Sequence, residues 1–135
     1  VALGPQTVTR AAGTFALVLV PTRELAMQTH EAVEQLSRPF PWLVTSILMG
    51  GERKKAEKAR LRKGVAVGVA TPGRVMDHLE STAAFRLERC GLLVLDEADR
   101  LLEMGFEDDK SGTVLFNFDE VKDLSDHPAN GWRVV

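Results

Sequence analysis

Two adjacent carboxylates, Asp96 and Glu97, directly follow the apolar run Leu92 to Leu95. If that run is a buried strand, both carboxylates emerge at its carboxyl end. The first could hold Mg²⁺ through water, which this ion gives up reluctantly, and the second could polarise an attacking water. The alternative is structural, because an acidic side chain at a helix start caps the helix and is favoured by its dipole. The pair alone leaves both interpretations open.

Three further motifs have residue types that suit an anion. The segment Thr71–Arg74 (Thr-Pro-Gly-Arg) combines a hydroxyl, a flexible glycine and a guanidinium at a predicted helix start, where free N–H groups attract phosphate. Its alternative is an ordinary first helical turn containing proline. In Pro21–Glu24, Thr22 could cap a helix and Arg23 could reach an anion. The pair Gly50–Gly51 allows another group to approach the backbone closely, or simply forms a tight turn.

The elements that must position these motifs alternate between strand and helix. Short apolar runs at 15–20, 46–49, 65–70 and 92–95 predict four strands buried on both faces. Helices are predicted over about 23–37, over the basic segment after Gly51, from the turn at 71–73 onward, and through Leu101 and Leu102. Apolar residues are expected to face the core at Leu25, Thr29, Ala32, Val33 and Leu36 in the first helix, and at Val75, Met76 and Leu79 in the third.

This alternation predicts a parallel sheet with right-handed crossovers. In such sheets, ligands bind at the carboxyl ends of the strands. All four motifs follow a predicted strand, so we expect them to lie together along one edge of the sheet. This shared placement is the strongest argument from the residues alone for a functional site.

The chain has 135 residues and a formal net charge of −2, but its charge is segregated. The segment 52–63 carries seven bases and two acids, and 96–109 carries seven acids and one base. The basic block could mark a face that binds a polyanion. The alternative, favoured on charge alone, is a solvated helix in which Glu57 pairs with Arg53 and Lys54.

The remaining candidates for chemistry give weaker signals. His30, His78 and His127 have no partner at metal-ligand spacing and are expected to be ordinary surface histidines. Cys90 is the only cysteine, which excludes an intramolecular disulfide, and we expect it to be a small packing residue. The chain has two tryptophans and no tyrosine, a poor basis for a base-stacking platform. No apolar run approaches the roughly 18 residues of a membrane span.

Taken in order, Pro-Thr-Arg-Glu-Leu, Met-Gly-Gly, Thr-Pro-Gly-Arg and Leu-Asp-Glu-Ala-Asp resemble the motifs of the DEAD-box RNA helicase family. The resemblance covers approximately Gly13 to Asp109. The stretch from Met49 to Gly64, and the residues after the acidic motif, further resemble the nucleolar subgroup that acts in large ribosomal subunit assembly. The resemblance implies the first RecA-like domain of an ATP-dependent RNA helicase, with a location in the nucleolus of the nucleus.

The resemblance also implies roles for individual residues. Asp96 would position Mg²⁺ on the phosphates of ATP, Glu97 would orient the hydrolytic water, and Asp99 would couple hydrolysis to RNA binding. Backbone contacts, which sequence-independent unwinding requires, would come from nine residues. They are Pro21, Thr22, Arg23, Gly50, Gly51, Thr71, Pro72, Gly73 and Arg74.

The chain departs from the family pattern in three respects. None of its 11 glycines is followed by lysine, so the phosphate-binding P-loop is not in this sequence. The Ser-Ala-Thr motif that would pair with Asp99 is also missing, and the pattern is lost after Asp109. The expected fold class is therefore α/β, a partial RecA-like P-loop NTPase domain whose mainly parallel sheet is flanked by helices and lacks the P-loop strand.

These departures leave two main hypotheses. The chain is either a fragment of a helicase that uses ATP and Mg²⁺, or a catalytically inactive module that binds RNA or a partner. A metal-dependent nuclease fits less well, because it leaves the other motifs unexplained. Expected partners are RNA and the second RecA-like domain of the parent protein, without a membrane. We expect a remnant segment at 1–14, the partial domain at 15–109 and an atypical tail at 110–135. We also expect the isolated chain to be poorly stable, because a missing internal strand leaves unpaired edges.

Overall fold

The computed structural model describes residues 13–87 and 89–104. They form four strands and four helices in strict alternation. In order, these are β1 (Ala16–Leu19), α1 (Arg23–Ser37), β2 (Thr45–Leu48), α2 (Lys54–Lys63), β3 (Val67–Ala70), α3 (Pro72–Ser81), β4 (Leu92–Leu95) and α4 (Ala98–Met104). The predicted tail at 110–135, with His127 and Trp132, lies outside the described residues, as does most of the segment 1–14.

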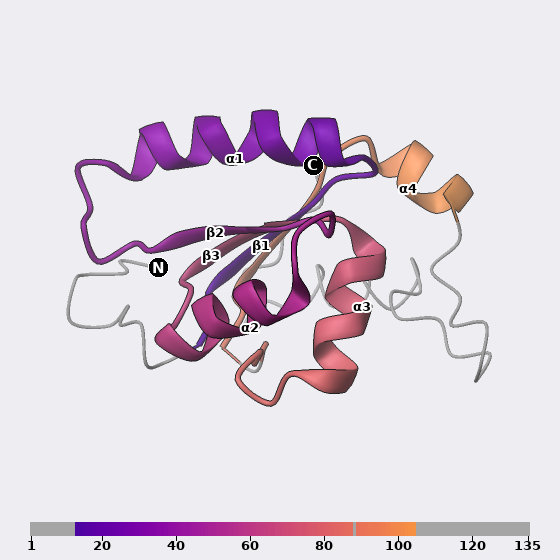
Figure 1. The fold of residues 1–135 in the computed structure, drawn as a ribbon. Helices are drawn as coiled ribbons and strands as arrows, with labels where there is room; N and C mark the ends of the chain where they lie inside the picture. The colour runs from indigo at the N-terminus through magenta and orange to yellow at the C-terminus, as the bar shows by residue number, and fades with distance from the viewer. Residues whose placement is uncertain (1–12, 88, 105–135) are drawn as a thin grey trace.

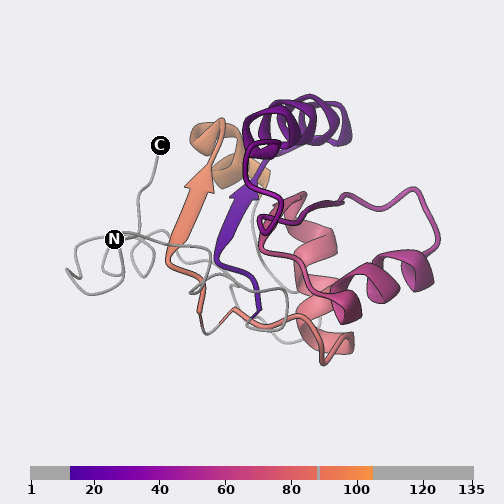
Figure 2. The same cartoon turned by 90° about the vertical axis from the view of Figure 1, so that its left-hand side faces the viewer.

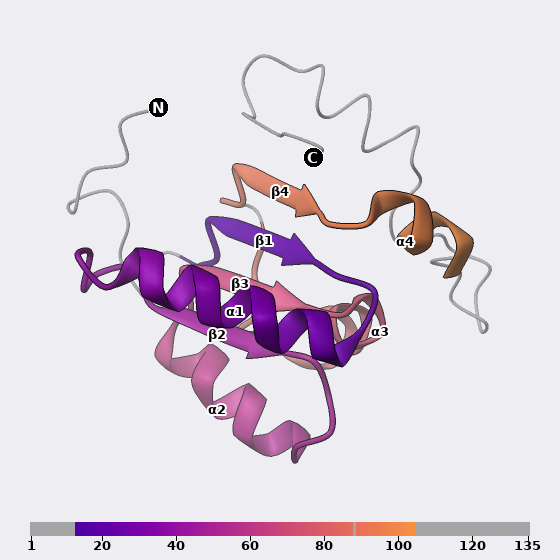
Figure 3. The same ribbon diagram turned by 90° about the horizontal axis from the view of Figure 1, so that it is seen from above.

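The four strands make one parallel sheet in the order β2-β3-β1-β4. Seen from above, all four point the same way (Figure 3). The register places Leu19 opposite both Ala70 and Leu95, so the strands end level with one another. Leu48 pairs with Ala70 in the same row. The predicted parallel sheet is therefore confirmed, and its carboxyl edge is even.

Helices cover both faces of this sheet. Helix α1 lies along one face, while α2 and α3 lie against the other (Figure 1). Because strand side chains alternate in direction, Val18 and Val20 pack toward α1, and Leu17 and Leu19 join the larger core on the α2 and α3 face. Figure 2 shows the arrowheads of β1 and β4 pointing toward the end of the molecule where α4 lies. Helix α4 contributes Leu101 to the larger core.

Helix α1 has the predicted bounds, but its buried face is turned from the predicted one. Ala26 is fully buried and Val33 packs beside it, whereas Leu36 is 75% exposed and Ala32 is exposed too. At about 100° per residue, Leu36 lies roughly 80° around the helix from Ala26. Leu25 and Thr29 remain at the margin of the contact with the sheet. The prediction was therefore wrong for Ala32 and Leu36.

Helix α3 buries a residue that the sequence placed on the surface. His78 is fully buried, while Leu79 is 36% exposed. Val75 occupies the core as expected, and His78, three residues later, continues the same helical stripe. Cys90 packs in the larger core, which confirms its assignment as a small apolar residue. Among the described residues, no helix is long and apolar enough to cross a membrane.

Candidate nucleic-acid interface at the carboxyl edge of the sheet

Backbone hydrogen bonds carry the sheet one residue beyond the strands and align the motifs. Val20 N donates to the Ala70 carbonyl at 3.0 Å, and Thr71 N donates to Leu48 at 3.1 Å. Asp96 N donates to the Leu19 carbonyl at 3.0 Å. The four motifs therefore begin side by side, as the strand pattern predicted. Their roles remain predictions.

The Gly50–Gly51 turn lies beneath two guanidinium groups. Both glycines have positive φ, +74° and +82°, a region that L side chains rarely adopt. A Cβ on Gly50 would lie 3.0 Å from Nη2 of Arg74, and one on Gly51 would lie 3.1 Å from Nη1 of Arg23. The turn needs glycine for its backbone conformation, and the missing side chains leave room for Arg23 and Arg74.

Arg74 is held by two carboxylates. Its Nε forms an ion pair with Oε1 of Glu57, and its Nη1 donates a hydrogen bond to Oδ2 of Asp77, both at 3.1 Å. Lys54 of α2 also pairs with Asp77. The hydrogen bond from Lys54, reinforced by Arg74, holds the pKa of Asp77 below its usual range. Arg74 is therefore oriented before any ligand arrives, with its side chain only 18% exposed.

An open hollow of about 480 Å³ lies where β1, β2 and β3 end. Seven of the nine predicted contact residues line it, together with Met49 and Asp77, which were not among the predicted contacts. Thr22 caps α1 by accepting a hydrogen bond from Leu25 N at 3.2 Å, as its residue type predicted. The seven are Pro21, Arg23, Gly50, Thr71, Pro72, Gly73 and Arg74.

The first turn of α3 opens into this hollow. Pro72 occupies the start of the helix, and Thr71 makes no side-chain capping hydrogen bond. The amides of the first helical turn have no partner within the helix. The Thr71 hydroxyl and these amides are the donor types that suit an anion.

The acidic motif lies at the other end of the same edge, after β4 (Figure 3). Asp96, Glu97 and Asp99 are all exposed. Glu97 has a positive φ of +53°, which is uncommon for a residue with a side chain, and its carboxylate lies 3.5 Å from Nη1 of Arg100. In the part of the chain that the structure describes, no three potential ligands form a cluster that could hold a metal.

The basic helix α2 is more than a solvated surface. Lys54 and Lys58 bond to α3, the latter to the Ser81 carbonyl at 3.1 Å. Arg60 donates from Nε to Ser46 Oγ at 3.0 Å and pairs with Glu52, which lowers the pKa of that carboxyl. The remaining bases of the segment are exposed, namely Arg53, Lys55, Arg62 and Lys63.

Glu57 was expected to pair along its own helix in solvent, and that interpretation was wrong. Its side chain is fully buried and bonds across to Arg74 and His78 of α3. A signal was present in the sequence. Glu57 lies four residues before Leu61, so the two share a helix face, and Leu61 belongs to the core.

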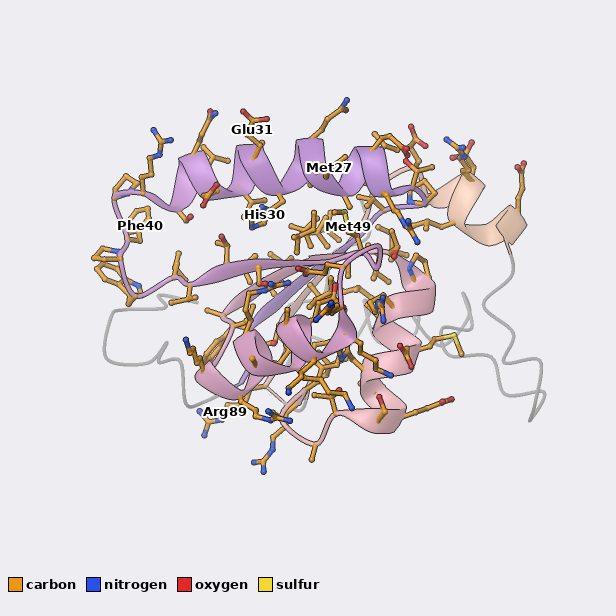
Figure 4. All side chains as sticks on the ribbon, viewed as in Figure 1. Met27, His30, Glu31, Phe40, Met49 and Arg89 are labelled. Carbon is orange, nitrogen blue, oxygen red and sulfur yellow. The ribbon has the colours of Figure 1, made fainter. Side chains whose placement is uncertain are left out.

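A second open hollow, of about 530 Å³, runs between α1 and β2. Figure 4 shows Met27 and His30 of α1 on the side of the helix facing the sheet, near Met49, while Glu31 points away. His30 Nε2 lies 3.3 Å from the Thr45 hydroxyl, so this half-buried histidine ties α1 to β2. Arg23 and the Gly50–Gly51 turn line this hollow as well as the first.

Comparison with known protein families matches residues 3–115 to the DEAD/DEAH box helicases. That match covers most of the chain. The chain belongs to the DEAD/DEAH box helicase family. Its parallel sheet flanked by helices is accordingly a partial RecA-like domain, as the motifs predicted.

Individual helicases are similar over most of this chain. The "ATP-dependent RNA helicase DBP7" of Gibberella zeae is 58% identical over 100 residues, covering 74% of this chain and 13% of its own length. The human "ATP-dependent DNA helicase DDX31" is 54% identical over 108 residues, covering 80% and 12%. The "Probable ATP-dependent RNA helicase CG8611" of Drosophila melanogaster is 56% identical over 100 residues, covering 74% and 10%. The chain thus spans about an eighth of the length of these helicases.

Proposed function

We propose that this chain is part of an ATP-dependent RNA helicase, and that the carboxyl edge of its sheet binds the phosphate backbone of the nucleic acid. One observation carries the proposal. The guanidinium groups of Arg23 and Arg74 lie together over the Gly50–Gly51 turn, beside the first turn of α3. Two guanidinium groups and the start of a helix surround one open hollow. Together these groups are suited to bind successive phosphates of a strand.

The same geometry explains why binding would be independent of base sequence. Guanidinium, hydroxyl and amide donors contact phosphate and sugar, which fix register but carry no base information. Among the residues that the structure describes, no Phe, Trp or Tyr lines the hollow, so this lining offers no aromatic surface on which a base could stack. An enzyme that remodels many sequences needs this kind of contact.

The choice of RNA over DNA is part of the proposal. The names of the similar helicases include both nucleic acids. Phosphate chemistry is shared between the two, and only the 2′-hydroxyl distinguishes them locally. We favour RNA because the four motifs together resemble those of RNA helicases.

The acidic motif fits a magnesium ion held mainly by a nucleotide. Mg²⁺ commonly uses one or two carboxylates together with waters and substrate phosphates. Asp96 and Glu97 are exposed and adjacent at the strand end. When bound, ATP with Mg²⁺ supplies the phosphoryl group that is hydrolysed. Asp96 would hold the ion through water, and Glu97 would orient the attacking water once its weak surface pair with Arg100 opens. Asp99 would couple this site to the bound RNA.

The cellular role follows from the narrower resemblance. We propose that the parent protein acts in ribosome biogenesis, in the nucleolus, together with a second RecA-like domain of its own. Residues 15–109 would be the portion of the first domain present here. Fluorescence microscopy of the tagged parent protein tests the location, and exclusion from the nucleolus would refute it.

Binding to a labelled single-stranded oligouridine, followed by fluorescence anisotropy, tests the interface. We expect salt-sensitive binding that the double variant Arg23→Ala, Arg74→Ala weakens by about tenfold or more. The slope of log affinity against log salt should fall by about 1.4, since each phosphate contact on a single strand contributes about 0.7. Arg62→Ala is the matched control, because Arg62 lines a hollow with Gly64 and Val65, which precede β3 at the opposite edge.

Two results would refute the interface. One is the absence of binding at low salt. The other is an equal loss of affinity in Arg62→Ala, which would mean that binding is only a nonspecific attraction to positive charge. An oligothymidine of the same length distinguishes the nucleic acids, because equal affinity for both would remove the preference for RNA.

A further inference from the structure

Glu57 is an acidic residue whose side chain is fully buried, whereas carboxylates normally lie at the protein surface. Its side chain is 0% exposed, and it belongs to α2, the most basic of the helices that the structure describes. Burying a carboxylate is costly unless charged and hydrogen-bonding partners surround it. The contacts that offset this cost therefore indicate what the residue does.

Those contacts join three separate parts of the site. Oε1 lies 3.1 Å from Arg74 Nε in an ion pair and 2.8 Å from His78 Nε2 in a hydrogen bond, both in α3. Oε2 accepts from Gly50 N at 3.4 Å, in the turn after β2. One carboxylate thus links α2, α3 and the glycine turn on which the two guanidinium groups lie.

His78 is itself fixed on its other side. Its Nδ1 lies 2.8 Å from the Thr82 hydroxyl, and its ring packs edge-on against Phe85 at a centroid distance of 6.2 Å. A carboxylate only accepts hydrogen bonds, so Nε2 carries the proton that it shares with Glu57. The ring orientation is therefore set, and Glu57 cannot turn away from Arg74 without breaking this chain of contacts.

Among the described residues, Nη2 of Arg74 has no hydrogen-bond partner. Nε forms an ion pair with Glu57 and Nη1 donates to Asp77, while Nη2 lies over Gly50 at the hollow. A planar guanidinium fixed at two nitrogens points its remaining donors along a defined line. A lysine could not do the same, because its ammonium is a single point of charge on a flexible stem.

We propose that Glu57, fixed by His78 and Thr82, is a positioning residue that directs the Arg74 guanidinium, over the Gly50 turn, toward a backbone phosphate. The proposal rests on the proposed phosphate-binding function of the hollow and deepens it. Helix α2 contributes to binding through its one buried acid, in addition to any attraction from its exposed bases. Glu57 touches no substrate and acts through Arg74.

The test relies on the opposite signs of two effects. If acids near the hollow act only through their charge, then removing either one should strengthen binding of an anionic strand. Glu52→Gln removes the same charge from an exposed carboxylate that also lies near Arg74. We expect Glu52→Gln to leave oligouridine affinity unchanged or raise it by less than about twofold. We expect Glu57→Gln to lower it by about tenfold, with a salt slope reduced by about 0.7.

A double-variant cycle separates positioning from loss of structure. In an Arg74→Ala background, Glu57→Gln should have no further effect on affinity, once binding is normalised to the folded fraction measured by circular dichroism. Thr82→Val, which removes only the outermost contact, should produce a smaller loss that also disappears in that background. This second variant keeps the test decisive if Glu57→Gln does not fold.

Each outcome has a clear meaning. Stronger oligouridine binding by Glu57→Gln would overturn the positioning role while leaving the proposed interface intact. The same holds if Glu57→Gln causes equal losses of affinity in chains with and without Arg74. If the unmodified chain binds no oligouridine, or Arg74→Ala changes nothing, the proposed function and the positioning role both fail.

Discussion

Gly50 provides the sharpest test of the glycine turn. Its φ is +74°, so an alanine there would be strained by about 1–2 kcal/mol. The added Cβ would also lie 3.0 Å from Nη2 and 3.3 Å from Nε of Arg74, a side chain that Glu57 and Asp77 hold in place. We therefore expect Gly50→Ala to lower the free energy of unfolding by about 2 kcal/mol. It should also weaken oligouridine binding, because Arg74 must move.

Gly73→Ala is the matched control for this substitution. Gly73 lies in the first turn of α3, and a Cβ there would meet no heavy atom of the described residues within 4 Å. Alanine favours a helix over glycine by up to about 1 kcal/mol, so we expect a small stabilisation. Urea unfolding followed by far-ultraviolet circular dichroism measures both variants. Changes of the same sign in the free energy of unfolding of the two variants, or a Gly50→Ala chain as stable as the unsubstituted chain, would refute the reasoning.

Three other outcomes follow from the structure. Burial raises the pKa of the Cys90 thiol to about 11 from 9.0, so the thiol should resist alkylation in the folded chain at pH 8. Because the folded state favours the protonated thiol, this contribution to stability is present below pH 9 and lost as pH rises toward 11. The 135-residue chain, which carries Asp96 and Glu97 without a P-loop, should show no RNA-stimulated ATP hydrolysis in a phosphate-release assay; measurable turnover would contradict this. Among the described residues β4 pairs only with β1, so one side of β4 presents unpaired backbone groups. The chain should therefore self-associate in sedimentation experiments, and Leu92→Lys in this edge strand, where Leu92 is exposed, should reduce the association. If the unsubstituted 135-residue chain is a monomer with a cooperative thermal transition, the predicted self-association is wrong.

Much of the architecture was predictable because it depends on local pattern. Each predicted strand overlaps an observed one, and α1 has the predicted bounds, since Thr22 caps its start and prolines follow its end. Placing the motifs along one edge required only that consecutive strands be parallel. The strand order was beyond this reasoning, because it depends on how whole strands and helices pack together.

The site was predicted less completely than the fold. The resemblance implied nine contact residues, and seven of them line the hollow. Thr22 caps α1, as its residue type predicted. The predicted burial of Leu36 was also wrong. The helical period of apolar residues does not by itself say which side of a helix packs against a twisted sheet.

The sequence alone determined the alternation of elements, the parallel sheet and the motifs at its carboxyl edge. These follow from apolar runs and turn residues that act over a few neighbours along the chain. Only the tertiary structure showed that Glu57 and His78 meet in the core across 21 residues and that Arg74 is fixed between Glu57 and Asp77. The physical reason is that a charged residue is buried only when distant partners satisfy it, and those partners come together through the packing of α2 against α3.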